Sequence, residues 1–116
     1  MKASLFAAVS LLALAGCSSA PVPTEQLNVT DQAIAQAQAV IGGEDAQPLQ
    51  GARQKAGQAR AALANGDNKA ARLAAEQAEL DARWVEAQAL ATKSDVRRQQ
   101  LQNQVGRLHR QLEVAQ

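Results

Sequence analysis

The sequence predicts an all-α protein: a small three-helix antiparallel bundle whose long C-terminal helix extends beyond the bundle as a coiled-coil-like arm. Three segments space their apolar residues at alternating steps of three and four, which places these residues on one helical face. Glycine turns at Gly42-Gly43 and Asn65-Gly66 separate the segments. Alanine, the best helix former, is abundant, and no run alternates polar and apolar residues as a half-buried strand does.

The N-terminus has the layout of a secretory signal, with Lys2 followed by an apolar run over residues 5–14. This run is too short to span a membrane, which needs roughly 20 apolar residues. It ends in Leu14-Ala15-Gly16-Cys17, which resembles the lipobox of bacterial lipoprotein precursors. The resemblance implies that the signal peptide, residues 1–16, is cleaved and that Cys17 is lipidated on its thiol and its new amine.

Residues 17–23 comprise the lipidated Cys17 and a tether of small residues and prolines. Cys17 is the only cysteine, so no internal disulfide can form, and its acyl chains would hold the protein on a membrane. The next residue is Ser18, where enteric bacteria use aspartate to retain lipoproteins in the inner membrane. By resemblance to that rule, we expect a lipid-anchored protein of the Gram-negative cell outer membrane, facing the periplasm.

The first two helices are expected to be short, about 18 residues or 27 Å each. The first is expected to begin after Pro23, with Thr24 as its N-cap, and to end at Gly42. The second is expected to begin near Pro48, which suits a first helical turn, and to end at Asn65. Their repeating faces carry Leu27, Thr30, Ile34, Ala37 and Ile41 in the first helix and Leu49, Ala52, Ala56, Ala59 and Leu63 in the second.

The third helix is expected to be the longest, with Asp67 as its N-cap. Trp84, the only aromatic residue after residue 16, is interpreted as an anchor of the core. A helix break at residues 92–95, capped by Ser94, is the alternative, but the unbroken phase favours one helix of about 45 residues, roughly 65–70 Å long. Its register comprises Leu73, Gln77, Leu80, Trp84, Ala87, Ala91, Ser94, Arg98, Leu101, Val105, Leu108, Leu112 and Ala115.

Helix length divides the mature chain into an alanine-rich bundle, residues 24–92, and an extended arm, residues 93–116, because the short helices can cover only half of the long one. An isolated helix of about 24 residues is marginal in water. The arm is therefore expected to bind another copy of the chain, through coiled-coil spacing, or a different envelope protein; a frayed or folded-back arm is the remaining alternative. The candidate interaction residues are Arg97, Arg98, Leu101, Val105, Leu108 and Leu112.

Residues 49–91 resemble a known family. Their centre, residues 61–78, reads Ala-Ala-Leu-Ala-Asn-Gly-Asp-Asn-Lys-Ala-Ala-Arg-Leu-Ala-Ala-Glu-Gln-Ala. With the lipobox and the Ala-Pro tether, this sequence is similar to the alanine-rich bacterial domain of unknown function 4398. The resemblance implies a helical envelope lipoprotein. Some members carry a following OmpA-like domain that binds peptidoglycan, but residues 93–116 have no such motif, and the family supplies no catalytic residues.

No motif for catalysis or metal binding is found. His109 is the only histidine and is interpreted as a solvated helix residue. Glu76, Glu79 and Asp81 are interpreted as surface charges, with Glu79 spaced to pair with Arg83. Balanced acidic and basic residues give no broad attraction to nucleic acid. We therefore expect no enzyme, no metal and no cofactor besides the covalent lipid.

The expected function is a structural, spacer or adaptor role in the cell envelope, anchored in membrane lipid through acylated Cys17. The alternative is a lipoprotein that associates with the cell wall, peptidoglycan, through its basic arm. On that arm Lys93, Arg97, Arg98, Arg107 and Arg110 outnumber Asp95 and Glu113, which suits an anionic surface.

Overall fold

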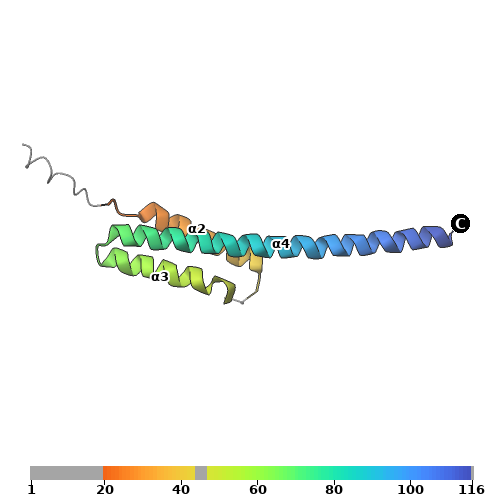
Figure 1. Ribbon diagram of the computed structural model, residues 1–116, viewed down its shortest axis with the longest axis horizontal. Helices are drawn as coiled ribbons and strands as arrows, with labels where there is room; N and C mark the ends of the chain where they lie inside the picture. Colours follow the sequence, from red (N-terminus) through yellow and green to blue (C-terminus); the bar gives the residue numbers. More distant parts are fainter. Residues whose placement is uncertain (1–19, 44–46, 116) are drawn as a thin grey trace, which may run out of the picture.

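The computed structural model describes residues 20–43 and 47–115, and within these ranges the chain is helical apart from short connections. The elements are helix α2 (Thr24–Ile41), the short 3-10 helix η2 (Gln47–Leu49), helix α3 (Gln50–Ala64) and helix α4 (Asn68–Val114). In Figure 1, α2 and α3 lie along the first half of α4, which continues far beyond them. The all-α class, the three-helix bundle and the extended C-terminal helix are confirmed.

Helix α4 is the central element, and α2 and α3 pack mainly on it rather than on each other. The Asn68 Nδ2 donates to the Ala20 carbonyl oxygen at 2.8 Å, so α2 and α4 begin at the same end of the bundle. The Lys93 ammonium donates to the Val40 carbonyl oxygen near the end of α2. Helix α3 returns between these two ends, which gives an up-down-up order.

The helix ends follow the predicted signals with one exception. The Asp67 Oδ1 accepts a hydrogen bond from the Ala70 backbone N–H at 2.9 Å, which confirms this residue as the N-cap of α4. Gly42 ends α2 with a φ of +73°, in the region that favours glycine. Thr24 as the N-cap of α2 is wrong, because the Pro23 carbonyl oxygen already accepts the first helical hydrogen bond, from the Leu27 N–H at 3.0 Å.

Helix α4 is continuous for 47 residues, about 70 Å. The alternative break at residues 92–95 is absent, and the Thr92 hydroxyl donates to the Gln88 carbonyl oxygen one turn earlier, at 3.0 Å. From residue 91 to residue 115, every residue is exposed except Gly106, which is half-buried. Neither α2 nor α3 therefore buries a side chain in this second part of α4.

Small residues fill the core of the bundle. Leu49 and Thr30 are the largest side chains that are fully buried in the described ranges. Alanine has almost no side chain to order, and its small size lets helix backbones approach closely. The faces predicted for the first two helices are confirmed at the positions that are buried in the structure. These positions are Thr30, Ala37, Leu49, Ala52, Ala56 and Ala59.

The predicted packing face of α4 is wrong within the bundle, and Trp84 is not a core anchor. Trp84 is 63% exposed, and Leu73 and Leu80 are exposed as well. The buried face is the one that carries Ala71, Ala75, Ala78 and Ala82, all wholly buried. These alanines share the three-and-four spacing of the larger residues, and helices that approach through alanine leave no space for a leucine or an indole between them.

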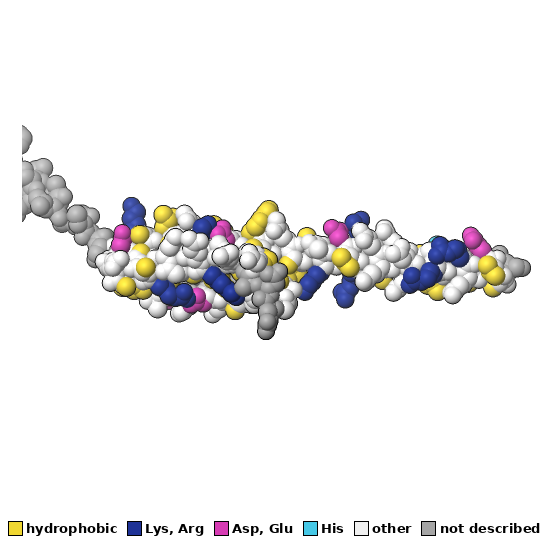
Figure 2. Space-filling view, turned by 90° about the horizontal axis from the view of Figure 1, so that it is seen from below, with side chains coloured by type: hydrophobic (Ala, Val, Ile, Leu, Met, Phe, Trp, Pro, Cys, Tyr) yellow, Lys and Arg dark blue, Asp and Glu magenta, His cyan; other side chains and the backbone are white. Residues whose placement is uncertain are grey.

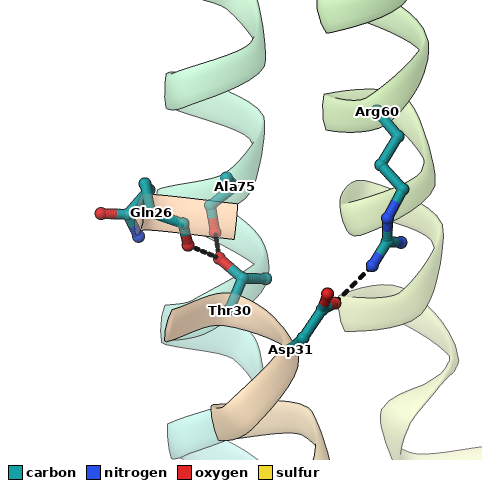
Figure 3. A network of polar contacts seen from close by, with 5 residues as sticks. All are labelled: Gln26, Thr30, Asp31, Arg60 and Ala75. Atoms are coloured by element: carbon teal, nitrogen blue, oxygen red, sulfur yellow. Dashed lines mark hydrogen bonds and ion pairs between the residues drawn. The ribbon is translucent and has the colours of Figure 1, made fainter. Parts of the chain in front are cut away.

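A buried hydroxyl joins α2 to α4 within this alanine-lined contact. The Thr30 Oγ1 lies 2.8 Å from the Gln26 carbonyl oxygen and 2.9 Å from the Ala75 carbonyl oxygen, and Figure 3 shows it between the two. On the surface, the Arg60 guanidinium donates to the Asp31 carboxylate and connects α3 with α2. The Thr30 hydroxyl thus connects α2 with the α4 backbone, and the Gln26 side-chain amide also donates to the Glu79 carboxylate of α4 at 2.6 Å.

Candidate interaction surface

Buried polar side chains and possible metal ligands are considered first among the described residues. Residues 20–43 and 47–115 include no group of three His, Cys, Asp or Glu side chains that could hold a metal ion. Every buried side-chain nitrogen or oxygen in the same ranges has a hydrogen-bond partner. His109 lies exposed on the arm, as expected for a solvated helix residue.

An apolar stripe runs along the outside of α4 from the bundle to the end of the arm. We call it the outer stripe, and its large side chains are between 51% and 66% exposed. It spans 40 residue positions, which is about 60 Å of helix. Its large members are Leu73, Leu80, Trp84, Leu101, Val105, Leu108 and Leu112, with Ala87 and Ala91 exposed between the two groups.

The outer stripe faces away from α2 and α3. Leu80 follows the buried Ala78 by two residues, and Trp84 follows the buried Ala82 by the same step. Two residues correspond to about 200° around a helix, so each pair lies on nearly opposite sides of α4. The half of the stripe that passes over the bundle is consequently as accessible as the half on the arm.

Charge is unevenly distributed along α4. The arm carries more basic than acidic side chains, and dark blue groups outnumber magenta ones along it in Figure 2. Arg98 lies in the register of the stripe and pairs with Asp95 at 3.0 Å, with both side chains about two-thirds exposed. An exposed pair of this kind contributes little to stability. In the bundle, Arg83 and Glu79 form the predicted pair at 2.6 Å.

The structure brings most of the predicted interaction residues together. Arg98, Leu101, Val105, Leu108 and Leu112 share one exposed face of α4, and Arg97 lies at its edge. Three further members, Leu73, Leu80 and Trp84, belong to the predicted register of α4, and the sequence prediction interpreted Trp84 as a core anchor. The alanines at 71, 75, 78 and 82 were the signal for the correct face, because they follow an equally regular spacing.

The predicted lipidation and sorting residues lie outside the described ranges. These residues are Leu14, Ala15, Gly16, Cys17 and Ser18. Among the helices that are described, none combines the length and the hydropathy needed to cross a bilayer.

Comparison with known proteins gives one informative match. No protein-family model matches the chain, and no curated protein does. A crystal structure of a DUF4398 family protein from Pseudomonas aeruginosa PAO1 is similar, with a TM-score of 0.76 and 41% sequence identity. The match covers 83% of this chain and 100% of that one, so it includes the bundle and more than the alanine-rich centre. The chain therefore belongs to the DUF4398 family.

Proposed function

We propose that this protein is a non-enzymatic lipoprotein of the cell envelope, anchored through Cys17 in the outer membrane and facing the periplasm, with a spacer or adaptor role. The observation that carries the proposal is the position of the two ends of α4. The Ala20 carbonyl oxygen accepts a hydrogen bond from Asn68, so the tether reaches the bundle where α4 begins. The tip of the arm lies about 70 Å away along the helix.

This geometry suits a protein that holds a binding surface at a distance from its own anchor. The covalent anchor follows from the lipobox sequence, and Ser18 supports transport to the outer membrane. The arm is rigid in the sense that it is one uninterrupted helix, and it presents large apolar side chains that no other described part of the chain covers. An adaptor needs both features, a fixed end and a free adhesive surface.

Lipid labelling tests the anchor. Cells that express the full chain or Cys17→Ser are grown with radioactive palmitate, and the protein is isolated and counted. We expect label on the unsubstituted chain and none on Cys17→Ser, which should also keep residues 1–16. Ser18→Asp is the matched control, because it keeps the thiol and should be labelled while moving to the inner-membrane fraction. Equal labelling of Cys17→Ser would overturn the proposal.

A cell-wall-binding role is the second candidate, and the exposed basic side chains of the arm favour it. Peptidoglycan carries carboxylates, which Lys and Arg bind by charge. The test is co-sedimentation with purified peptidoglycan in low and in physiological salt. Binding that falls in the double variant Arg107→Gln with Arg110→Gln would support this role. The control is Arg53→Gln with Arg60→Gln, which removes the same charge from the bundle. Equal sedimentation of all three would reject it.

A further inference from the structure

We propose that α4 pairs with α4 of a second copy in antiparallel orientation through the outer stripe, so that the arm of each copy covers the bundle half of the other. This inference goes beyond the proposed function. Because α4 begins where the tether meets the bundle, the antiparallel pair places the two tethers at opposite ends, about 70 Å apart, so two copies anchored through Cys17 in one membrane would lie along it. The antiparallel pair differs from pairing through the arms alone, because it includes the exposed Leu73, Leu80 and Trp84 in the same interface.

The size of the outer stripe supports pairing along its whole length. A face about 60 Å long and on the order of 10 Å wide corresponds to about 600 Å² on each copy. The two copies together would bury about 1,200 Å², which is the lower end for a stable, specific interface. Pairing of the arm halves alone would bury roughly half as much, within the range of weak contacts.

Access to the stripe is open over this length. The helices α2 and α3 pack on the buried alanine face of α4, which is about 200° from the outer stripe. A second long helix can therefore lie against the stripe beside both the arm and the bundle without meeting α2 or α3. The bundle does not restrict the contact to the arm.

Charge selects the antiparallel orientation. A parallel, in-register pair would place Arg98 opposite its own counterpart in the seam and two basic arms side by side. The antiparallel pair places each arm beside residues 68–92 of the other copy. That segment lacks the basic excess of the arm, because Glu76, Glu79, Asp81 and Glu86 balance Lys69, Arg72, Arg83 and the Lys55 of α3 that pairs with Asp81 at 2.7 Å. The antiparallel pair therefore avoids the repulsion between two basic arms.

Side-chain size agrees with this orientation. When the full stripes overlap, Leu112 lies opposite Leu73 of the second copy, Val105 opposite its Leu80, and Leu101 opposite its Trp84. The same alignment sets Ala91 opposite Ser94 and Arg98 opposite the small Ala87. Three of the four large apolar side chains of the arm thus meet large apolar side chains, whereas Leu108 lies opposite Gln77. The Arg98 guanidinium lies beside a methyl group, where its long stem can reach water.

Cysteine cross-linking tests the orientation directly. Two differently tagged full chains, one with Leu80→Cys and the other with Val105→Cys, are co-expressed, and their membranes are oxidised. We expect a disulfide-linked dimer of the two chains at twice the 12.2 kDa chain mass, less the cleaved signal. Each variant alone should give no such dimer, because the two copies of residue 80 would lie about 37 Å apart.

The other outcomes decide against the proposal. Self-linked dimers of Leu80→Cys alone and Val105→Cys alone indicate a parallel pair and overturn it. A link to another protein, or no link in any combination, overturns self-pairing. The unsubstituted chain, whose one cysteine is Cys17, measures the background. A Leu80→Cys copy that links to Leu112→Cys instead would overturn the full overlap of the stripes, because position 112 lies seven residues, about 10 Å of helix, beyond the position opposite residue 80.

A second measurement separates the stripe from general apolar exposure. Leu101→Glu, added to both cysteine chains, should abolish the cross-link, whereas Val96→Glu should leave it unchanged. Both side chains are about half exposed on the arm, but only Leu101 belongs to the stripe. Trp84 is the only tryptophan, so its emission should shift to shorter wavelength as the purified chain is concentrated, and this shift should vanish in Leu101→Glu. Equal loss in both variants would contradict a stripe-specific pair.

Discussion

The two faces of the first half of α4 differ in side-chain size and in what covers them. One face carries Ala71, Ala75, Ala78 and Ala82 and is wholly buried by α2 and α3, and the other carries Leu73, Leu80 and Trp84 and is exposed. Burial here follows the fit between helices rather than the hydrophobicity of each side chain. Small residues let three backbones come close, and the larger apolar surface stays available for a contact between molecules.

This division has a consequence for stability. Alanine contributes little apolar area, so the bundle depends on close contact between helices and on the few larger buried groups, such as Leu49 and Thr30. A change of side-chain size on the alanine face should therefore alter the free energy of unfolding more than the loss of the Trp84 ring from the outer stripe. The unfolding of single-residue variants tests this order.

The largest effect is expected from enlarging the buried face. Ala78→Leu replaces a methyl group with an isobutyl group where the side chain is wholly buried between helices, and the overpacking should destabilise the bundle by roughly 1–3 kcal/mol or more. Thermal unfolding followed by circular dichroism measures the loss. Gln77→Leu is the control, since it places the same group on the exposed side one residue earlier. Equal melting of both variants would contradict an alanine-packed core.

Most of the fold could be predicted from sequence because local signals determine it. The turns at Gly42 and Gly66, the cap at Asp67 and the unbroken phase of α4 each involve neighbouring residues, and the structure confirms them. The lengths of the two short helices then predicted the residue at which the arm begins. These features need no knowledge of how the helices meet.

The packing face of α4 could not be predicted in the same way. Ala78 and Leu80 lie on two faces with equal periodicity, and a prediction based on hydrophobicity chooses the larger residues. The choice depends on the distance between helices, which is a property of all three together. The same error hid part of the candidate surface, since Trp84 in the core could not be counted with Leu101 on the arm.

A smaller effect is expected from the buried hydroxyl. Thr30→Val keeps the shape of the side chain but removes the hydrogen bond to the Ala75 carbonyl oxygen at 2.9 Å, so the bundle should lose about 1 kcal/mol. Urea unfolding measures the change. Thr92→Val is the matched control, because its hydroxyl bonds only the carbonyl oxygen of Gln88 in its own exposed helix. Equal losses in both variants would show that the contact between α2 and α4 contributes nothing.

A still smaller effect is expected from truncating Trp84, the largest side chain of the outer stripe. Trp84 is 63% exposed in the single chain, and complete burial of a large apolar side chain is worth about 1.5–3 kcal/mol, so Trp84→Ala should cost less than about 1 kcal/mol. Unfolding is measured by circular dichroism at a dilution where the midpoint no longer depends on concentration. A loss of 3 kcal/mol or more would return Trp84 to the core and reverse the assignment of the two faces.

The smallest effect should come from removing the arm. A chain that ends at residue 93 keeps Lys93 and its hydrogen bond to the Val40 carbonyl oxygen, and the described side chains that it loses are all exposed. At high dilution, its melting midpoint should stay within about 4 °C, the shift that 1 kcal/mol produces at the lower limit for a domain of this size. Total ellipticity should fall with the lost residues, and the cross-link between cysteines at positions 80 and 105 should be impossible. If the midpoint instead collapses, the arm stabilises the bundle of its own chain, and the outer stripe is then an internal surface rather than one that serves a second copy.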